Sequence, residues 1–480
     1  MEELFDKKEF EYFIPGIYSD HDAAAVAKFK EEIGKIAARG PVDPADLVAG
    51  KCDGLPGVSG PVEISGKLMK AMADNYIAEN PLFNDEEYAK KAGYESVPAY
   101  YFINEPNYMP AMPMGQYLGD CMLVSGHNDM MNYYKPVYEG DKLWTVIDWQ
   151  DCEDITPLAG SHYRTWALSG QAKVYNQKGE LVAEGANILK ESFRRHKDPA
   201  KQTAMRAWES PDWWHQRPHY VYTDADWEYI KDLWKKETVR GSEPLYWDDV
   251  EVGTEVVTSV GGPVLIDQES DIVFHLPKWA AETKVNMLDP EKFKDMVKDE
   301  HNLYYPKDHA VKKPGKVFKM SILDDEDDGK EKPEAAKAHD MPEMPPEVAN
   351  RDGRSVIQNA VCTKWAATAI INWMGDAGWL RTIAWDIMST PPGYDATVIP
   401  HFTKKPELFN LFPYLAKVPG MEGKRADCHA MEYDTIVTHA YVTDKYEKDG
   451  EYLVDLTWWC ETIDHYLVQE GGATVVLPKK

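Results

Sequence analysis

One long apolar segment decides the fold that the sequence predicts: VIQNAVCTKWAATAIINWM, residues 356–374. It is apolar on nearly every side, which is the pattern of a helix buried all round and not of one lying on a surface. Gly375 follows directly and suits the end of a helix, because glycine readily adopts the left-handed conformation found there. The segment therefore indicates a central helix that other elements enclose.

Strand-like segments follow this helix. They cover Ile436–Val442, Tyr452–Trp459 and Gly472–Leu477, and the first two are separated by turn residues at Glu447–Gly450. Their alternation and their β-branched residues favour an antiparallel sheet with one face covered. The second half of the chain is therefore expected to be a sheet wrapped around a helix.

The first half of the chain repeats this arrangement. Strand-like segments occur at Trp144–Trp149, His162–Leu168 and Ala172–Gly185, with turn residues at Asn176–Gly179. The counterpart of the central helix is expected at roughly Val97–Met112. The sequence thus predicts an α+β fold with two antiparallel sheets, each wrapping a long helix: a double hot dog.

The repeat suggests three parts: an N-terminal domain at 1–195, a helical connector at 196–242 and a C-terminal domain at 243–480. The second domain holds insertions near 280–350 and 390–425. Long loops in a compact fold are usually functional, so we expect the 390–425 insertion to cover a binding cleft.

The connector carries a helix start signal. Thr223–Asp226 reads as a capping box, and Trp227, Ile230 and Trp234 then fall on one helical face. We expect these three side chains to pack against a domain surface. Glu243–Gly253 is expected to form the opening strand of the second domain.

Composition and charge limit the kinds of partner that this protein is expected to bind. The 480 residues are 43% hydrophobic, enough for a large core, and the net charge is −28. Such an acidic chain argues against nucleic acid and anionic membranes as partners, and an anionic ligand would need local basic residues. No stretch of 18 uninterrupted apolar residues occurs, so no membrane span is expected.

The cysteines and the N-terminal residues point to a cytoplasmic protein. The six cysteines are widely and irregularly spaced, which is typical of reduced structural thiols. The first residues lack the basic start and apolar run of a signal peptide. No Cys/His cluster suggests zinc and no glycine-rich phosphate loop occurs, so neither a metal nor a cofactor is expected.

Two phrases in the first half carry a family resemblance. Glu79–Ala89 and Pro136–Leu143 resemble the MaoC-like acyl dehydratases, or R-specific enoyl-CoA hydratases, which have the hot-dog fold. The motif of that family is Asp-x-Asn-Pro-x-His, in which the Asp and His activate the water that adds to, or leaves, an enoyl thioester. Here Asn80-Pro81 match, but Ala78 stands in place of the Asp and Phe83 in place of the His.

A third phrase, in the second half, extends the resemblance to most of the chain. Asn372–Arg381, which contains Trp-Met-Gly-Asp-Ala-Gly-Trp-Leu, resembles the second half of a two-domain MaoC-like subgroup. Residues 280–350 and 390–425 match poorly. The resemblance implies the double hot-dog fold, whereas activity varies within this fold.

The resemblance also directs attention to the segment before the long helix. Val348-Ala349 matches a pair in the family, and counting back from it places the family's His on Glu343. His339 and Asp340 lie within reach on the same proline-rich loop. We therefore expect the catalytic residues to be His339, Asp340 and Glu343, acting as proton donors and acceptors.

The first half, without its motif acid and His, would supply a binding pocket. The backbone N–H groups near Asn359 would polarise the substrate carbonyl if the helix starts there. For the aromatic residues the alternative is plain core packing, and for His127 it is a hydrogen-bonded structural role. The expected substrate-binding residues are Asn80, Tyr100, Tyr101, Tyr108, His127, Asn359 and Asp376.

The leading functional hypothesis is a hydro-lyase of the enoyl-CoA hydratase or dehydratase type. It would act on an α,β-unsaturated acyl thioester, with a bulky or cyclic acyl group, and a CoA thioester is the expected partner. The missing motif residues favour an alternative: a catalytically silent acyl-binding protein, or the partner subunit of an active dehydratase. Thioester hydrolysis is a further alternative. A homodimer is expected, since hot-dog domains commonly pair.

Overall fold

The structure is a computed structural model that describes residues 20–103, 122–154, 164–193, 217–264, 279–306, 360–388, 405–409, 411–426 and 428–480. The chain forms two compact units. Unit 1 comprises Met1–Ile64, Asn104–Arg217 and Arg381–Pro413, and unit 2 comprises Ser65–Ile103, Pro218–Leu380 and Tyr414–Lys480. Each unit is therefore assembled from separated stretches of sequence. The domain limits expected from the repeat remain a prediction.

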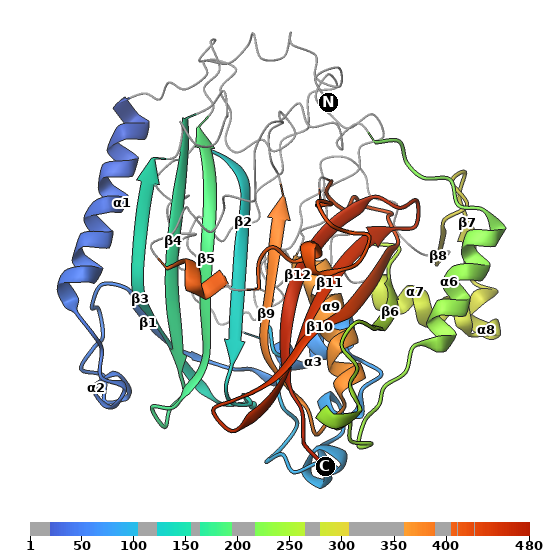
Figure 1. Cartoon of the computed structure of the whole chain (residues 1–480), viewed down its shortest axis with the longest axis horizontal. Coiled ribbons are helices and arrows are strands. Elements are labelled where there is room, and N and C mark those ends of the chain that lie inside the picture. Colours follow the sequence, from blue (N-terminus) through green and yellow to red (C-terminus); the bar gives the residue numbers. More distant parts are fainter. Residues whose placement is uncertain are drawn as a thin grey trace, which may run out of the picture. The chain divides into compact units, whose positions relative to one another are not determined.

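The strands of unit 1 form an antiparallel sheet in the order β1-β3-β4-β5-β2-β9 (Figure 1). Residues 381–388 of β9 belong to this unit. The alternation seen in the sequence predicted β3, β4 and β5, each of which runs past the C-terminal end of its predicted segment, but it did not predict β1, β2 or β9. The strands are β1 Val58–Glu63, β2 Met122–Tyr133, β3 Lys142–Asp154, β4 Arg164–Tyr175, β5 Leu181–Phe193 and β9 Trp379–Met388.

The turn between β4 and β5 forms where the sequence predicts it. The side-chain oxygen of Asn176 accepts hydrogen bonds from the N–H groups of Lys178 at 2.9 Å and Glu180 at 3.0 Å. Gly179 has a φ of +73°, a conformation that costs glycine little. Helix α1 (Asp20–Arg39) lies alongside β3, and the short helix α2 (Pro44–Val48) follows it.

The strands of unit 2 are also antiparallel, in the order β12-β11-β10-β6. Asp449 and Gly450 have φ values of 53° and 82°, the pair of left-handed residues that a tight hairpin between β10 and β11 favours. The bounds are β6 Glu255–Gly261, β10 Ile436–Lys448, β11 Glu451–Thr462 and β12 Leu467–Val476.

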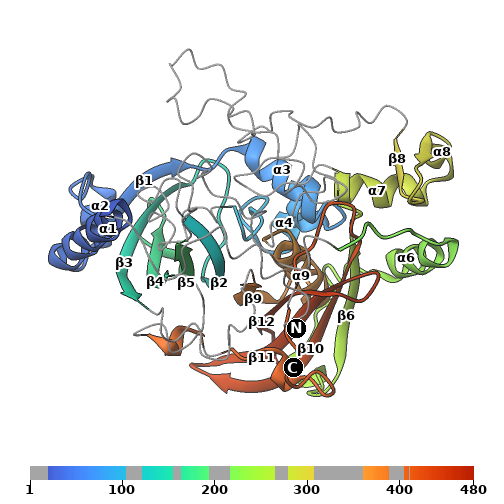
Figure 2. The ribbon, with the colours of Figure 1, turned by 90° about the horizontal axis from the view of Figure 1, so that it is seen from above.

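Helix α9 (Ala360–Met374) is the predicted central helix of unit 2, and residues 356–359 of the prediction lie outside the described residues. It packs against β6, β10, β11 and β12, with helix α3 (Gly66–Tyr76) also in contact (Figure 2). Its side chains are buried nearly all round, as the sequence predicts. Gly375, with a φ of +73°, ends it.

The packing of α9 on β6 requires a glycine in the strand. A Cβ atom placed on Gly261 would lie only 2.3 Å from the ring of Trp365 in α9. A side chain at this position would therefore push the helix away from the strand. This close contact fixes one wall of the cleft described below.

These elements confirm the α+β class of the predicted double hot dog, since each unit holds antiparallel strands and α9 is wrapped by a sheet. The counterpart helix expected at Val97–Met112 is not helical in its described part, residues 97–103, and the rest lies outside the described residues. Instead, this stretch follows the 3-10 helix η2 (Pro81–Phe83) and the helix α4 (Glu86–Lys91).

The connector helix α6 (Asp224–Lys236) is confirmed, including its capping box. Trp227, Ile230 and Trp234 are buried, and the indole N–H of Trp234 donates to the carbonyl oxygen of Val260 at 3.2 Å. These side chains therefore pack on unit 2 as predicted.

The predicted opening strand at Glu243–Gly253 is wrong. The segment forms the 3-10 helix η8 (Trp247–Asp249) because the indole N–H of Trp247 donates to the carbonyl oxygen of Leu453 and its backbone N–H donates to that of Pro478. These contacts hold the segment against β11 and the C-terminal residues, and the strand begins later, with β6.

The described part of the 280–350 insertion contains α7 (Trp279–Leu288), α8 (Pro290–Phe293) and a small hairpin of β7 (Met296–Lys298) and β8 (Tyr304–Pro306). The other insertion contributes the 3-10 helices η12 (Pro406–Phe409) and η13 (Leu415–Lys417). None of the described helices has the length and hydropathy to cross a membrane.

The 390–425 insertion was expected to cover a cleft. In its part that belongs to unit 2, Leu415 and Val418 pack on Trp459 of β11. Cys460, the next residue of β11, points towards α9, so Trp459 faces the opposite side of the sheet. These described residues therefore cover the outer face of the sheet and not the cleft along α9.

Candidate functional site

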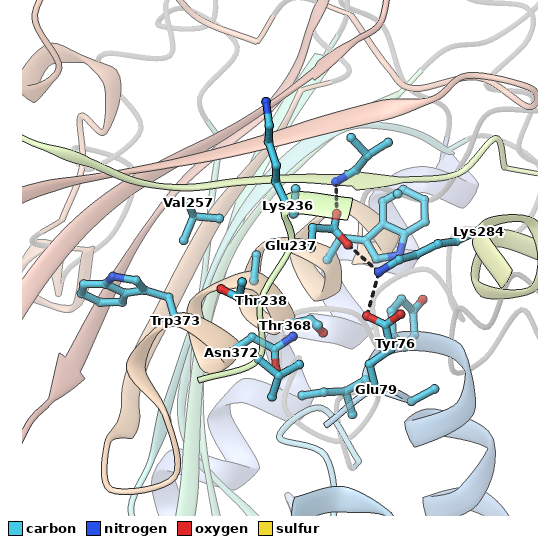
Figure 3. A pocket seen from close by; sticks show the side chains of 18 of the residues that line it. Tyr76, Glu79, Lys236, Glu237, Thr238, Val257, Lys284, Thr368, Asn372 and Trp373 are labelled. Carbon is cyan, nitrogen blue, oxygen red and sulfur yellow. Dashed lines mark hydrogen bonds and ion pairs between the residues drawn. The ribbon is translucent and has the colours of Figure 1, made fainter. Parts of the chain in front are cut away.

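A cleft with a volume of about 1120 Å³ lies along helix α9 in unit 2 (Figure 3). Its walls come from α3 and the residues after it, from the segment after α6, from β6, from α7 and from α9. Ligand pockets for small molecules commonly measure about 300–1,000 Å³, so this cleft has room for a large ligand.

One face of α9 forms the floor of the cleft. Trp365, Thr368, Ala369, Asn372 and Trp373 line it, at the three- and four-residue spacing that puts side chains on one helical face. The floor therefore combines aromatic surface with one hydroxyl and one amide group. Apolar residues of β6, among them Val257, form the adjoining wall.

Three charged side chains meet at one wall of the cleft. The ammonium nitrogen of Lys284 on α7 lies 2.7 Å from a carboxylate oxygen of Glu237 and 2.7 Å from one of Glu79 (Figure 3). The side chains of Lys284 and Glu237 are only 16% and 18% exposed, whereas that of Glu79 is 58% exposed. Glu237 and Lys284 thus form a largely buried ion pair that Glu79 extends towards solvent.

Glu237 is held at both carboxylate oxygens. It directly follows α6, and its other oxygen accepts a hydrogen bond of 2.6 Å from the backbone N–H of Val260 in β6. Among the strands that the structure describes, β6 is the last in its sheet, and the Glu237 carboxylate takes the place of a neighbouring strand as the partner of this N–H. The carboxylate accepts the hydrogen bond that this edge N–H would otherwise lack, and the bond holds the carboxylate in position.

Burial and charge change the acidity of both partners. Burial raises the pKa of Glu237, and the nearby Lys284 opposes that rise only in part. For Lys284, burial acts to lower the pKa, but the hydrogen bonds and charges of Glu237 and Glu79 outweigh it and raise the pKa. A buried carboxyl with a shifted pKa and one specific charged partner, lying in a cleft, is a candidate functional group.

The residues at the altered motif lie in two different environments. Ala78 lines the cleft, next to Glu79. Phe83 is buried and packs edge-on against Tyr100, with ring centres 6.2 Å apart. The position of the motif acid therefore faces the cleft without a proton-transfer group, and the position of the motif His belongs to the core.

Asn80, predicted to bind substrate, is buried and supports a residue of the cleft floor. Its side-chain oxygen accepts from the N–H of Leu82 at 3.0 Å, which caps η2. Its amide nitrogen donates to the side-chain oxygen of Asn372 at 2.9 Å. Asn80 therefore orients Asn372, which lines the cleft.

Tyr100 lies behind the cleft lining. Its hydroxyl donates to the carbonyl oxygen of Lys364 at 2.7 Å and lies 3.0 Å from the hydroxyl oxygen of Thr368. Its ring stacks on Tyr76, with centres 5.9 Å apart. Thr368 and Tyr76 line the cleft, and Tyr100 holds both from behind.

Tyr101 and Asp376 lie elsewhere in unit 2 and are not among the lining residues of the cleft. The hydroxyl of Tyr101 accepts from the N–H of Leu380 at 3.4 Å. Asp376 accepts a hydrogen bond of 2.7 Å from the hydroxyl of Tyr88, and burial raises the pKa of its carboxyl. Asp376 therefore ties the loop after α9 to α4.

The remaining predicted site residues are not placed at this cleft. His127 lies in β2 of unit 1. The predicted catalytic residues His339, Asp340 and Glu343, together with Tyr108 and Asn359, lie outside the described residues. Among the residues that the structure does describe, no group of three or more His, Cys, Asp or Glu side chains would hold a metal ion.

The sequence interpretation missed Glu237 and Lys284. Glu237 reads as one of several charged residues at the end of the connector helix, and Lys284 falls in the 280–350 stretch, which matches the family poorly. A search for acidic residues directly after a predicted helix would list Glu237 among many others. Only the fold brings the two side chains together.

No family model matches this chain, and no curated protein is similar to it. Solved structures with a related arrangement include a MaoC domain protein from Chloroflexus aurantiacus, at 12% identity, a TM-score of 0.42, and coverage of 88% of this chain and 94% of that chain. A conserved protein from Mycobacterium tuberculosis with a double hotdog fold matches at 9% identity and a TM-score of 0.41, covering 87% and 95% of the respective chains. Another is a MaoC-like dehydratase, at 9% identity, a TM-score of 0.40, and coverage of 88% and 96%.

Proposed function

We propose that the cleft along α9 binds an α,β-unsaturated acyl thioester, with CoA as the carrier, and that the protein adds water to it or removes water from the hydrated form. This is the reaction of the MaoC-like hydratases and dehydratases that the sequence resembles. The volume of about 1120 Å³ suits a bulky or cyclic acyl group.

The observation that carries this proposal is the charge of the cleft lining. The chain as a whole has a net charge of −28, yet the lining combines four acidic side chains with the four basic side chains of Lys236, Arg240, Lys284 and Lys292. The lining therefore carries no net formal charge, which lowers the repulsion that an acidic protein exerts on an anionic thioester. Lys292 is exposed at α8 and would contact the phosphate groups of the carrier.

A second candidate is a protein that binds the acyl thioester without converting it. Ala78 favours this alternative, because it lines the cleft at the position of the motif acid and carries no group that transfers protons. In this case the cleft would serve as a carrier site or as part of a larger dehydratase.

The test is incubation of the full chain with a panel of enoyl-CoAs, including cyclic ones. The absorbance of the conjugated thioester falls on hydration, and release of free thiol would instead indicate hydrolysis. Calorimetry with the same compounds separates binding from turnover. Hydration supports the first proposal, tight binding without conversion supports the second, and neither binding nor conversion overturns both.

Charge reversal tests where the carrier binds. Lys292→Glu is expected to weaken binding about fivefold at low salt, which corresponds to about 1 kcal/mol for one charge contact in a largely aqueous environment. Lys135→Glu is the matched control, since it makes the same charge change on an exposed side chain of unit 1. Equal effects of the two changes would argue against a carrier site in this cleft.

A further inference from the structure

The altered motif lacks a group that transfers protons, and another side chain of the cleft can take over this role. Hydration requires a group that takes a proton from water and a group that gives a proton to the α-carbon. Ala78 provides neither. The cleft that Ala78 lines also contains the carboxyl group of Glu237, which comes from a different element, the end of the connector helix α6.

We propose that Glu237 is the acid–base residue of this cleft, in place of the missing motif acid, and that Lys284 is its positioning residue; this rests on the proposed hydro-lyase function. The carboxyl group is fixed by the Val260 N–H at 2.6 Å and by the Lys284 ammonium at 2.7 Å. Each oxygen keeps a second lone pair for water or substrate. A carboxyl group held this rigidly is preorganised for proton transfer.

In the hydration direction, the Glu237 carboxylate removes a proton from water while the water oxygen forms its bond to the β-carbon. The electrons of the carbon–carbon double bond move towards the thioester carbonyl. The protonated carboxyl then gives its proton to the α-carbon, which restores the carboxylate. One water is added across the double bond, no other reactant is consumed, and dehydration follows the same steps in reverse.

Lys284 is better suited to positioning than to proton donation. Its ammonium group donates to two carboxylates, which raise its pKa and make it a weak acid. Its positive charge acts to lower the pKa of Glu237 and so opposes part of the rise that burial causes. Glu79, which is 58% exposed, completes the charge cluster from the solvent side.

The experiment compares Glu237→Gln with Glu79→Gln. Both changes remove one carboxylate from the same lysine, but only Glu237→Gln removes the proposed acid–base group, while its amide oxygen can still accept from the Val260 N–H. We expect Glu237→Gln to lower kcat about 100-fold or more, with the affinity for a saturated acyl-CoA changed less than about threefold. Glu79→Gln changes the same charge cluster but keeps the proposed acid–base group, so it should lower kcat by less than about tenfold.

Three further variants distinguish a loss of catalysis from a folding defect. Glu237→Ala should regain part of its turnover when formate is added, because formate fits the space and carries the missing carboxyl group. Lys284→Met should move the acid limb of the kcat profile to higher pH, since Glu237 loses its counter-charge, and Lys284→Arg should move it back. A purely structural lysine would lower kcat equally at every pH.

The outcomes separate the two proposals. If the wild type converts no enoyl thioester, both the proposed function and this inference fail. If the wild type is active and Glu237→Gln is as active as Glu79→Gln, only the assignment of Glu237 fails. Loss of activity in variants of His339, Asp340 or Glu343 but not of Glu237 would place the chemistry on the loop before α9.

Discussion

Two lysine–glutamate pairs of nearly equal length lie in very different surroundings. In the cleft of unit 2, Lys284 and Glu237 are 2.7 Å apart and 16% and 18% exposed. In unit 1, Lys135 and Glu180 are 2.8 Å apart and 47% and 36% exposed. An exposed pair contributes little because water screens it, whereas a buried pair leaves a costly charge behind when one partner is removed. Distance alone therefore says little about what an ion pair does.

Removal of one lysine should show the largest difference. Lys284→Met leaves the Glu237 carboxylate in a poorly solvated site, so we expect the free energy of unfolding to fall by about 2–3 kcal/mol. Lys135→Met should lower it by less than about 1 kcal/mol. Urea titration of both variants measures the two values, and similar losses would show that the cleft pair is as well solvated as the surface pair.

Removal of both charges in the cleft should cost less than removal of one. The double variant Lys284→Met/Glu237→Gln leaves no buried carboxylate at this site, and its glutamine can still accept from the Val260 N–H. We expect it to be more stable than Lys284→Met by about 1 kcal/mol. If the double variant is less stable than Lys284→Met, then Lys284 is not what offsets the cost of burying the Glu237 carboxylate.

The same comparison can be made for neutral hydrogen bonds at the hydroxyl groups of Tyr100 and Tyr101. The hydroxyl of Tyr100 lies 2.7 Å from the carbonyl oxygen of Lys364 and 3.0 Å from the hydroxyl oxygen of Thr368, whereas the hydrogen bond from the N–H of Leu380 to the hydroxyl of Tyr101 is longer, at 3.4 Å. Tyr100→Phe should therefore lower the free energy of unfolding by about 1 kcal/mol and Tyr101→Phe by less than about 0.5 kcal/mol. Thermal unfolding compares them. A larger loss from Tyr101→Phe would contradict this ranking.

His439, on the outer face of the unit 2 sheet, should show a pH-dependent ion pair. Its ring nitrogens lie 2.8 Å from Glu255 and 3.6 Å from Glu461. Burial acts to lower the pKa of His439, but these carboxylates outweigh it and raise the pKa. Because the folded pKa is raised, the stabilisation is fully present below the unfolded value of about 6.5 and is lost as the pH rises through the folded pKa.

We therefore expect His439→Gln to cost more stability at pH 6 than at pH 8, by roughly 0.5 kcal/mol. The control is His465→Asn, because the side chain of His465 is 80% exposed and asparagine tolerates the φ of 68° at this position. Urea titrations at the two pH values measure both variants. If His439→Gln costs the same stability at pH 6 and at pH 8, the His439 ring stays neutral over this range.

Local patterns in the sequence predicted much of the fold. The apolar segment around Trp365, the capping box at Thr223 and the turn at Asn176 each depend on residues close together in the chain, and each is confirmed. The predicted strand at Glu243–Gly253 failed for the opposite reason. Trp247 makes its deciding hydrogen bonds to Leu453 and Pro478, which are distant in sequence, and these override the local tendency.

The sequence by itself therefore determined the central helix, its glycine end, the hairpins and the loss of the motif acid at Ala78. Only the tertiary structure decided that Glu79, Glu237 and Lys284 meet at the cleft, since 205 residues separate Glu79 from Lys284 and 47 separate Lys284 from Glu237. Helices and turns are set by hydrogen bonds and packing between near neighbours. The acidity of a carboxyl group depends on burial and on charges brought close by folding, which no spacing along the chain encodes.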